Sequence, residues 1–264
     1  MGVQHSGDTL ATNARAIVAN SSIAHVAPTS SRQMPVGAND GPNRSSRLSR
    51  PGGIFQTKPP IRSYPLKRAI DVAGSLVLLF ALTPLMVLTA VAIWMFDPGP
   101  VLFSQVRIGA GGRHFKVLKF RTMRTDADEM LARLIATDPS ARKEWGARQK
   151  LAKDPRITWL GKFLRRSSID ELPQFLNVLK GEMSLVGPRP ILATERTHYG
   201  RHTLSYCSVK PGLTGLWQVS GRNNTTYARR VALDVTYSRR ISLALDLKIL
   251  VATIPAVLGA KGCY

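Results

Sequence analysis

The chain has 264 residues, enough for one sizeable domain with appendages, and its 37 Lys and Arg against 16 Asp and Glu give a formal net charge of +21. A surplus of this size indicates an anionic partner, which is nucleic acid, anionic lipid or a phosphorylated substrate. The two cysteines, Cys207 and Cys263, form no CxxC pair, which argues against a disulfide framework or a structural zinc site and fits a reducing compartment.

Residues 1–60 are rich in Ser, Asn, Gly, Pro and Arg, as in SSRQMPVGANDGPNRSSRLSRPGG, and sustain no apolar period. Such a segment does not bury enough apolar surface to offset its ordering entropy, so we predict a disordered basic tail. It has no apolar stretch of the signal-peptide type, so secretion is not indicated.

Residues 72–96 read VAGSLVLLFALTPLMVLTAVAIWMF and carry no charged side chain. About 20 apolar residues cross a hydrocarbon core of roughly 30 Å, so the run is long enough for a membrane segment. Basic residues flank it on both sides, which favours a cytoplasmic location for both ends. These are Lys58, Arg62, Lys67 and Arg68 before it, and Arg107, Arg113, Lys116 and Lys119 after it.

The pair Thr83-Pro84 lies in the middle of this run, where a proline removes a backbone donor and breaks or kinks a helix. We expect residues 61–98 to form a re-entrant membrane helix that turns at this pair. A spanning helix that tolerates a central proline also fits the pattern. Asp71, at the start of the segment, needs a partner at that depth, and we expect Lys67 and Arg68 on the same helical face to supply it.

Residues 99–264 read as one compact, mostly helical α/β domain. PVLFSQVRIG and HFKVLKFRTM alternate apolar and polar residues around the turn sequence GAGGR, which predicts a short β-hairpin after the membrane segment. DADEMLARLIA and PSARKEWGARQKLA then predict two helices, the second of them polar.

The stretch SSIDELPQFLNVLKGEMSLVGPRP, residues 167–190, concentrates the candidate chemistry. Ser168-x-x-Glu171 matches a capping box, and a helix that starts near Asp170 tolerates Pro173 in its first turn and ends at Gly181. Its predicted apolar face consists of Leu172, Phe175, Leu176 and Leu179.

At a helix N-terminus the backbone N–H groups favour negative charge, which should keep both Asp170 and Glu171 ionised. An ionised carboxylate serves as a nucleophile or holds a divalent cation. Acidic residues are also common helix caps, so the local pattern leaves a purely structural role open.

Gly187-Pro188-Arg189-Pro190 predicts a rigid turn that presents one guanidinium, a group suited to bidentate phosphate binding. No GxxxxGK[ST] loop and no GxGxxG turn occurs, which disfavours an ordinary NTPase or dinucleotide enzyme. Further cationic candidates are Lys119, Arg121, Arg156 and Arg166.

The C-terminal third adds a Gly-rich stretch, residues 212–217, followed by Gln218 and Arg222. It either shapes a nucleotide or sugar pocket or is an ordinary loop, and Trp217 either stacks on a base or belongs to the core. His198 and His202 lack a nearby ligand set and are expected on the surface. The apolar residues 243–260 predict a helix at the membrane interface or in the core.

Four stretches in this order resemble the bacterial sugar transferase family, the monotopic phosphoglycosyl transferases, over about residues 67–264. They are KRAIDVAGS, GPVLFSQVRIGAGGRHFKVLKFRTM, DPRITWLGKFLRRSSIDELPQFLNVLKGEMSLVGPRP and VKPGLTGLWQVSGRN. The insertion ARKEWGARQKLAKDPR and the ending GCY look most like the polyprenyl-phosphate galactose or glucose phosphotransferases that start exopolysaccharide or O-antigen synthesis.

The resemblance implies a catalytic domain at the cytoplasmic face of the bacterial inner membrane, which moves a sugar 1-phosphate from a UDP-sugar to undecaprenyl phosphate and releases UMP. It implies that Asp170 is the nucleophile, that Glu171 helps to hold Mg²⁺, and that Pro188, Arg189 and Pro190 contact the nucleotide sugar. Lys119, Arg121, Arg156, Gln218 and Arg222 are the other expected substrate-binding residues. The family breaks its re-entrant helix at Ser-Pro, for which this chain has Thr83-Pro84.

Downstream glycosyltransferases are the expected partners, a homo-oligomer is an open possibility, and no nucleic acid is expected. The alternative is a membrane-anchored basic protein that binds nucleic acid or an acidic polymer in a salt-sensitive way. It is disfavoured because the basic residues lack interleaved aromatics and no helix-turn-helix or zinc-finger pattern occurs.

Overall fold

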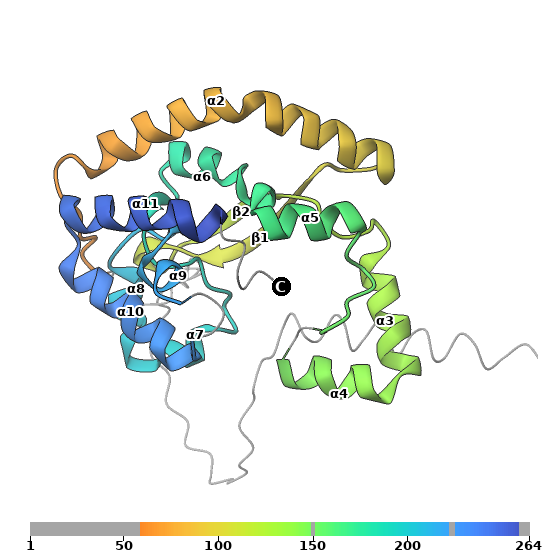
Figure 1. The fold of residues 1–264 in the computed structure, drawn as a ribbon. Helices are drawn as coiled ribbons and strands as arrows, with labels where there is room; N and C mark the ends of the chain where they lie inside the picture. The colour runs from red at the N-terminus through yellow and green to blue at the C-terminus, as the bar shows by residue number, and fades with distance from the viewer. Residues whose placement is uncertain (1–58, 149–150, 222–224, 259–264) are drawn as a thin grey trace, which may run out of the picture. The chain divides into compact units, whose positions relative to one another are not determined.

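A computed structural model describes residues 59–148, 151–221 and 225–258 of the chain (Figure 1). It divides into two compact units, residues 1–51 with 126–156 and residues 52–125 with 157–264. Nearly all of the predicted tail, Arg222 and Cys263 lie outside the described residues. The predicted boundaries at residues 60 and 98 stay a prediction.

The described part of the first unit contains α3 (Ala127–Thr137) and α4 (Pro139–Arg148), which confirms both predicted helices. Asp128 and Glu129 lie in the first turn of α3, where the helix dipole favours acidic residues. Asp138 separates the two helices, and its carboxylate accepts backbone N–H groups of Ser140 and Ala141 at 2.8 and 3.2 Å. This side chain therefore satisfies free donors at the start of α4.

In the second unit, α2 (Lys67–Phe96) is one helix of 30 residues and is long and apolar enough to cross a membrane. It continues through Pro84, so the break predicted at Thr83-Pro84 is absent. The Thr83 hydroxyl donates to the carbonyl of Leu79 at 2.6 Å, one residue before the carbonyl that Pro84 leaves without its usual donor.

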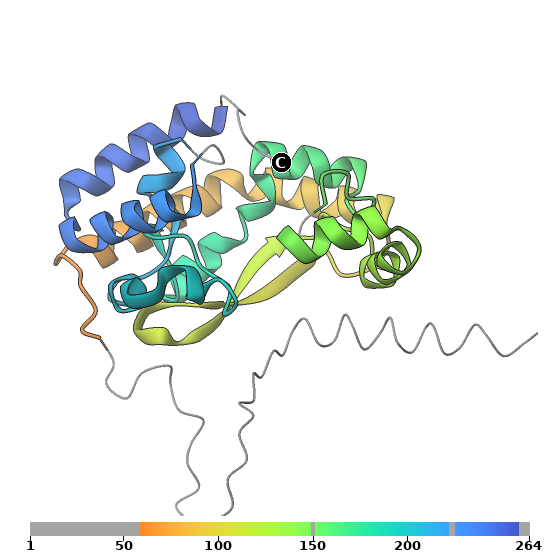
Figure 2. The same cartoon turned by 90° about the horizontal axis from the view of Figure 1, so that it is seen from below.

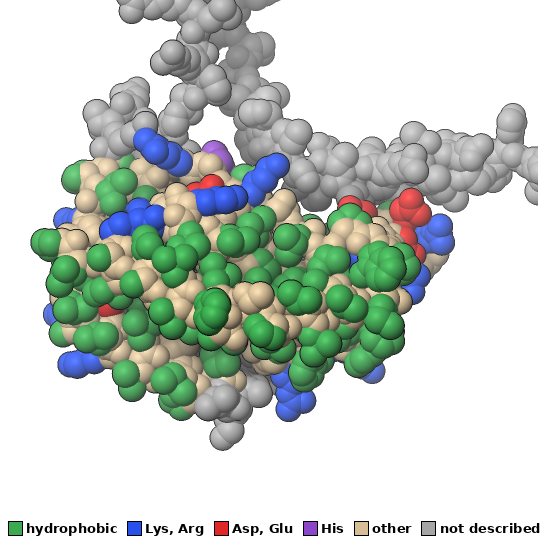
Figure 3. Space-filling view, turned by 90° about the horizontal axis from the view of Figure 1, so that it is seen from above, with side chains coloured by type: hydrophobic (Ala, Val, Ile, Leu, Met, Phe, Trp, Pro, Cys, Tyr) green, Lys and Arg blue, Asp and Glu red, His purple; other side chains and the backbone are tan. Residues whose placement is uncertain are grey.

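One face of α2 packs along its whole length against the rest of the second unit. In Figure 1, α2 lies above α6 (Gln174–Lys180). Its buried residues recur at helical spacing: Lys67, Asp71, Ser75, Thr89 and Ile93. The opposite face is apolar and exposed, and Figure 3 shows hydrophobic side chains gathered along it. It includes Leu76, Val77, Phe80, Val87, Leu88, Val91 and Trp94.

The predicted partners of Asp71 are wrong. Its carboxylate accepts the Ser184 hydroxyl at 2.9 Å and the Leu185 N–H at 3.0 Å. Lys67 instead pairs with Asp246, and Arg68 donates to two carbonyl groups of α6. Contacts across the tertiary structure thus replace the local pairing that helical spacing suggests.

The predicted hairpin is confirmed by β1 (Leu102–Ile108) and β2 (His114–Phe120), which pair antiparallel with Leu102 opposite Phe120 (Figure 2). A short 3₁₀ turn, Ala110–Gly112, connects them. Gly111 and Gly112 have φ values of 65° and 72°, a left-handed conformation that glycine adopts at little cost.

The stretch that carries the acidic pair runs through α5 (Trp159–Ser167), the 3₁₀ helix η2 (Ile169–Glu171) and α6. The α-helix thus begins at Gln174, after Pro173, and not near Asp170. The predicted capping box is wrong, because the Ser168 side chain makes no cap hydrogen bond. Gly181, at φ 79°, ends α6 as predicted. On the predicted apolar face, Phe175 is buried but Leu176 is exposed.

The strands β3 (Ser184–Val186) and β4 (Gly212–Thr214) pair in parallel. Between them lie α7 (Arg196–Tyr199), η3 (Gly200–His202) and α8 (Thr203–Cys207), and after them α9 (Leu216–Val219), α10 (Tyr227–Arg240) and α11 (Leu243–Leu258). The described chain is therefore mostly helical with two small sheets, as expected for the predicted class.

The largest hydrophobic core joins β2, α6, β3, α10 and α11 through Val117, Val178, Val186, Tyr237 and Ile249. The predicted C-terminal helix is confirmed as α11, with Pro255 inside it. It buries Asp246 and Ile249 but exposes Leu247, Val251 and Ile254. It therefore contributes one face to the core and leaves a second apolar face open.

Asp234 of α10 makes stability pH-dependent. It is 1% exposed and accepts the Tyr199 hydroxyl at 2.7 Å. Burial raises the pKa of Asp234 to about 7, against the opposing effect of that hydrogen bond. The folded state therefore binds the proton more tightly than the unfolded chain, so this contribution is complete below about pH 4 and is lost as the pH rises to about 7.

The variant Asp234→Asn keeps an oxygen that accepts from Tyr199 but does not ionise. We expect its free energy of unfolding to fall less than that of the wild type between about pH 5 and pH 8. Urea denaturation at the two pH values measures this difference. Parallel losses in the two proteins would show that Asp234 does not titrate in this range.

Candidate active site

Asp170 and Glu171 form the end of η2, and η2 begins directly after a strained residue. Ser168 has a φ of 60°, which makes it the one non-glycine residue with positive φ in the described chain. Such a conformation is costly for a residue with a Cβ and is held by its surroundings. The Glu171 N–H donates to the Ser168 carbonyl at 3.1 Å, which closes the turn that carries the acidic pair.

Lys119 of β2 lies between the two carboxylates. Its Nζ is 2.6 Å from Glu171 Oε1 and 3.6 Å from Asp170 Oδ2. Lys119 was predicted to bind substrate, and the structure brings it to the acidic pair. We call Lys119, Asp170 and Glu171 the candidate catalytic cluster.

The surroundings shift the pKa values of the two carboxyl groups in opposite directions. For Glu171, burial alone would raise the pKa, but Lys119 and Arg189 outweigh it and lower the pKa to about 2. For Asp170, burial raises the pKa above its ordinary value, Lys119 opposes this, and the charge of Glu171 adds to it. Paired carboxyl groups in different environments are typical of sites that divide chemical roles between them.

The predicted turn after β3 is held backbone to backbone by β4. The Gly187 N–H donates to the Thr214 carbonyl at 2.9 Å, and the Gly212 N–H donates to the Pro188 carbonyl at 2.8 Å. Arg189 is exposed and makes no hydrogen bond or ion pair with another described residue. The turn therefore presents a guanidinium that is open to an anion.

Arg107 of β1 lies beside this turn. Its Nη1 is 3.3 Å from both the Pro190 carbonyl and Glu195 Oε2, and its Nη2 donates to Gln105 Oε1 at 2.7 Å. Burial and, next, the charge of Arg189 lower the pKa of Arg107. Two guanidinium groups that repel each other gain from an anion placed between them.

Lys119, Glu171, Arg107 and Arg189 line one pocket together with residues of β4, and Asp170 is not among the lining residues. The polar lining of the pocket consists of Arg107, Lys119, Glu171, Gln174, Arg189 and Gln218. Two buried amide atoms, Gln174 Nε2 and Gln218 Oε1, have no hydrogen-bond partner among the described residues. An acceptor oxygen would satisfy the first and a hydroxyl group the second, so both suit a phosphorylated sugar.

Gln218 and the Pro188-Arg189-Pro190 turn were predicted, whereas Arg107 and Gln174 were missed. Gln174 follows Glu171 by three residues, a spacing that indicates a shared face of one helical turn. Arg107 lies opposite Phe115 in the hairpin, and alternation then places it on the same face as Lys119. That signal depends on the strand register, which the sequence does not fix.

Other predicted residues lie elsewhere. Arg121 bonds the carbonyl of Asp97 and lies 3.5 Å from its carboxylate, so it holds the end of α2. Arg156 belongs to the first unit and makes a bidentate ion pair with Asp154 at 2.8 and 2.7 Å. Arg166 is exposed, and Arg222 lies outside the described residues.

Trp217 belongs to the core. It is 5% exposed, and the guanidinium carbon of Arg230 lies 4.7 Å from the centre of its ring. His198 is exposed, as predicted, and His202 is half-buried; His198 stacks on Tyr227 at 4.4 Å.

The acidic pair offers the donors that Mg²⁺ prefers. Across the described residues no group of three or more His, Cys, Asp and Glu side chains gathers. Mg²⁺ is commonly held by only one or two carboxylates and completes its shell with water and substrate phosphates. Asp170 and Glu171, the latter with its pKa lowered to about 2, fit this pattern and would share their charge with Lys119.

Gly215 permits the close approach of β4 to the Gly187 turn. A Cβ at Gly215 would overlap the carbonyl oxygen of Gly187, whereas a Cβ at Gly146 of α4 would meet nothing within 4 Å. We expect Gly215→Ala to displace the turn that carries Arg189, with a loss of roughly 1–3 kcal/mol in stability and lower activity. Gly146→Ala, the matched control, should stabilise its helix slightly. Thermal unfolding and turnover of both variants measure the effects, and equal behaviour would refute this role of Gly215.

The pocket presents an ionised carboxylate, a lysine and the open guanidinium of Arg189, and the carboxyl group of Asp170 lies beside its Lys119; this combination suits an enzyme that transfers a phosphate-linked group. The chain belongs to the bacterial sugar transferase family, whose family model matches residues 62–260. This confirms the resemblance and makes the chain a transferase.

Named relatives agree with this membership. The exopolysaccharide production protein ExoY of Rhizobium meliloti is 46% identical over 198 residues, which cover 75% of this chain and 88% of that protein. An undecaprenyl-phosphate galactose phosphotransferase of Salmonella typhimurium is 45% identical over 199 residues, 75% of this chain and 42% of that protein. A UDP-glucose:undecaprenyl-phosphate glucose-1-phosphate transferase of Xanthomonas campestris pv. campestris is 44% identical over 198 residues, 72% of this chain and 38% of that protein.

Proposed function

We propose that this enzyme transfers galactose or glucose 1-phosphate from a UDP-sugar to undecaprenyl phosphate, releases UMP and so starts exopolysaccharide synthesis. The observation that carries the proposal is the candidate catalytic cluster, in which Lys119 Nζ lies 2.6 Å from Glu171 and 3.6 Å from Asp170, in a unit whose pocket also presents Arg107 and Arg189. The names of the relatives support the substrates.

The proposed reaction has two steps. A carboxylate oxygen of Asp170 attacks the β-phosphorus of the UDP-sugar, the bond from that phosphorus to the bridging oxygen breaks, and UMP leaves with the electron pair. An oxygen of undecaprenyl phosphate then attacks the same phosphorus and releases the Asp170 carboxylate, which leaves a lipid diphosphate sugar. Because the intermediate is covalent, the two anionic substrates do not have to occupy the site together.

The side chains of the pocket have separate roles in this scheme. Arg189 and Arg107 bind the diphosphate of the donor, where developing negative charge needs fixed positive groups. Glu171 keeps Lys119 in place next to Asp170, and Gln174 and Gln218 bond oxygen atoms or hydroxyl groups of the donor. Mg²⁺, held by Asp170 and Glu171, would neutralise phosphate charge.

We also propose that α2 lies along the cytoplasmic leaflet of the bacterial inner membrane with both ends on the cytoplasmic side. Lys67 at one end pairs with Asp246, and Asp97 just after the other end pairs with Arg121. A helix that crossed the bilayer would draw the unit packed along it into hydrocarbon, where its polar groups would go unsatisfied. The apolar exposed face of α2 offers the surface for lipid contact.

This topology is testable with one cysteine introduced at the exposed residue Ser63 or Pro100, in a variant that lacks Cys263 and keeps the buried Cys207. A membrane-impermeant maleimide added to intact spheroplasts should label neither position, and it should label both after permeabilisation. Labelling of one position in intact spheroplasts would show that α2 crosses the membrane.

The proposed function is tested with the full chain in lipid nanodiscs that contain undecaprenyl phosphate. UDP-galactose and UDP-glucose are supplied in turn, with and without Mg²⁺, and UMP and the lipid-linked sugar are measured. We expect UMP release from at least one donor, matched by lipid-linked product. Salt-sensitive binding of nucleic acid without UMP release from any UDP-sugar would support the binding-protein alternative instead.

A further inference from the structure

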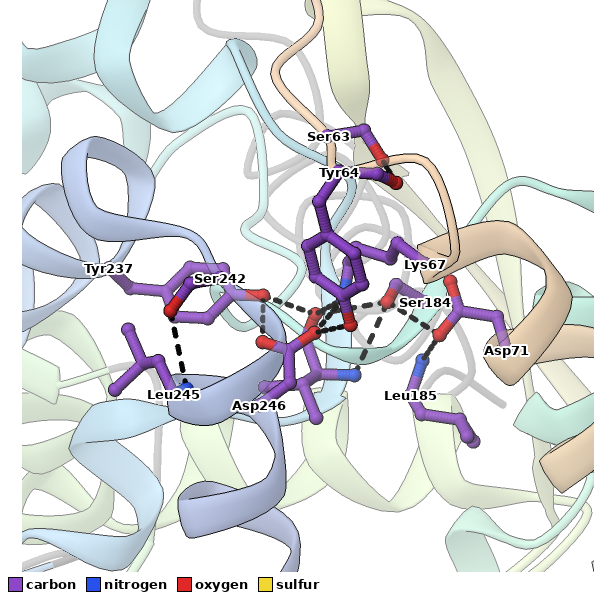
Figure 4. A network of polar contacts seen from close by, with 11 residues as sticks. Ser63, Tyr64, Lys67, Asp71, Ser184, Leu185, Tyr237, Ser242, Leu245 and Asp246 are labelled. Carbon is purple, nitrogen blue, oxygen red and sulfur yellow. Dashed lines mark hydrogen bonds and ion pairs between the residues drawn. The ribbon is translucent and has the colours of Figure 1, made fainter.

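A network of buried polar side chains from α2, β3, α10 and α11 lies outside the pocket lining (Figure 4). We call it the anchor network. Its members are Lys67 and Asp71 of α2, Ser184 of β3, Tyr237 of α10 and Asp246 of α11, and the half-buried Tyr64 joins it. None of these residues lines the pocket.

Asp246 is the centre of the network. Its Oδ2 accepts from Lys67 Nζ at 2.5 Å and from the Tyr64 hydroxyl at 2.9 Å, and its Oδ1 lies 2.8 Å from the Tyr237 hydroxyl. Burial and, next, the charge of Asp246 raise the pKa of Tyr237, which keeps its hydroxyl a donor.

The carbonyl of Val186 is the second meeting point. It lies 3.1 Å from Lys67 Nζ, 2.9 Å from the Tyr237 hydroxyl and 3.0 Å from the Ser184 hydroxyl. Val186 is the last residue of β3, and the turn that carries Arg189 begins at the next residue. With Asp71 bonded to Ser184 and Leu185, side chains of α2 hold each residue of β3.

Stability alone does not account for this network. The side chains of Lys67 and Asp246 are only 7% and 5% exposed. The cost of removing two charges from water largely offsets their attraction, so a buried ion pair contributes little net stability compared with apolar packing. What such bonds do provide is direction, since each donor fixes the position of its acceptor.

The turn transmits that position to Arg189. Only Gly187 and Pro188 separate Val186 from Arg189. The φ angles of Pro188 and Pro190 are fixed by their rings, and Gly187 and Pro188 are bonded to β4. A shift of the Val186 carbonyl therefore reaches the backbone of Arg189 through two residues, of which only Gly187 has freely adjustable backbone dihedral angles.

We propose that Lys67, Tyr237 and Asp246 are positioning residues for Arg189, and that they tie the diphosphate-binding turn to the start of the membrane helix. The inference rests on the proposed function, because the ligand assigned to Arg189 is the diphosphate of the donor. It goes beyond that function because it makes donor affinity depend on residues that do not touch the donor.

The test compares Tyr237→Phe with Tyr199→Phe. Each variant loses a buried hydroxyl next to a buried aspartate: the Tyr237 hydroxyl lies 2.8 Å from Asp246, and the Tyr199 hydroxyl lies 2.7 Å from Asp234. Of the two, only the Tyr237 hydroxyl also contacts the Val186 carbonyl. With the full chain in nanodiscs, we would measure the KM for UDP-sugar and kcat. The midpoint temperature of thermal unfolding is measured on the same samples. Binding of UDP is measured by calorimetry in an Asp170→Asn background, which does not depend on turnover.

We expect both variants to lower the thermal midpoint to a similar extent. Only Tyr237→Phe should raise the KM and weaken UDP binding, by about five- to tenfold, which corresponds to roughly 1 kcal/mol for a lost hydrogen bond. Tyr199→Phe should stay within about twofold of the wild type in both measurements. The proposal is overturned if the two variants shift the KM and UDP binding equally, or if Tyr237→Phe shifts neither.

If Tyr237→Phe does not fold, Ser184→Ala and its control Ser238→Ala decide by the same criterion. Both hydroxyl groups are buried; that of Ser184 lies 2.9 Å from Asp71 and 3.0 Å from the Val186 carbonyl, and that of Ser238 donates to the carbonyl of Val235. A wild type that releases no UMP would defeat the proposed function, whereas the comparison of UDP binding would still decide whether the anchor network positions Arg189.

Discussion

Replacing Asp170 with Asn should abolish UMP release from UDP-sugar, with turnover at least about a thousandfold below the wild type, as for other enzymes that lose their nucleophile. The amide has nearly the shape of the carboxylate but does not attack phosphorus. Asp170 is 6% exposed and burial raises its pKa, so a neutral side chain is accommodated without loss of stability. The variant should therefore fold and fractionate with membranes.

The control is Asp128→Asn in the first turn of α3, which removes an exposed carboxylate and should leave turnover unchanged. In the wild type, brief incubation with UDP-sugar alone should add a sugar phosphate to the peptide that contains Asp170, detectable by mass spectrometry. Full turnover by Asp170→Asn, or turnover without any adduct on this peptide, would remove the basis of the covalent mechanism.

The elements that follow from local sequence were predictable. The alternation in β1 and β2, the acidic start of α3 and the left-handed Gly181 each depend on neighbours within a few residues. The acidic pair and Arg189 were found in the same way, because each lies in a short motif with its own backbone signature.

The contacts that assemble the site were less accessible. Helical spacing predicted that Asp71 pairs with Lys67 and Arg68. In the structure its carboxylate instead accepts the buried hydroxyl of Ser184, 113 residues further along the chain. Arg107 lies near Arg189 only because the pairing of β1 with β2 places it beside the turn that follows β3. Such pairings depend on tertiary packing, which local spacing does not encode.

The continuous course of α2 through Pro84 has a similar cause. The sequence indicated a break, because proline removes one backbone hydrogen bond. In the structure, Leu79, Leu82, Met86 and Ala90 pack on both sides of the proline against the hydrophobic core clusters of the second unit. Burial of several apolar side chains, each worth about 1.5–3 kcal/mol when complete, is large enough to keep the helix in one piece.

Replacing Lys119 with Met should shift the pH dependence of catalysis to higher pH. In the proposed mechanism Asp170 attacks as a carboxylate, so kcat/KM should rise with pH through the pKa of Asp170, which burial holds above its ordinary value. Lys119 is the largest influence that lowers this pKa. An opposite charge at such a distance typically changes a pKa by about 1–3 units, so without it the acid limb should move up by about one unit or more.

Lys116→Met is the matched control, since Lys116 lies on the same strand but is exposed and is not among the residues that line the pocket. Its pH profile should coincide with that of the wild type. In Lys119→Met, activity near neutral pH should fall and recover partly as the pH is raised, because a larger share of Asp170 then loses its proton. Loss of activity by the same factor at every pH would assign Lys119 to substrate binding and not to the charge state of Asp170. Whether the pH profile shifts therefore separates the two roles that the position of Lys119 between the carboxylates allows.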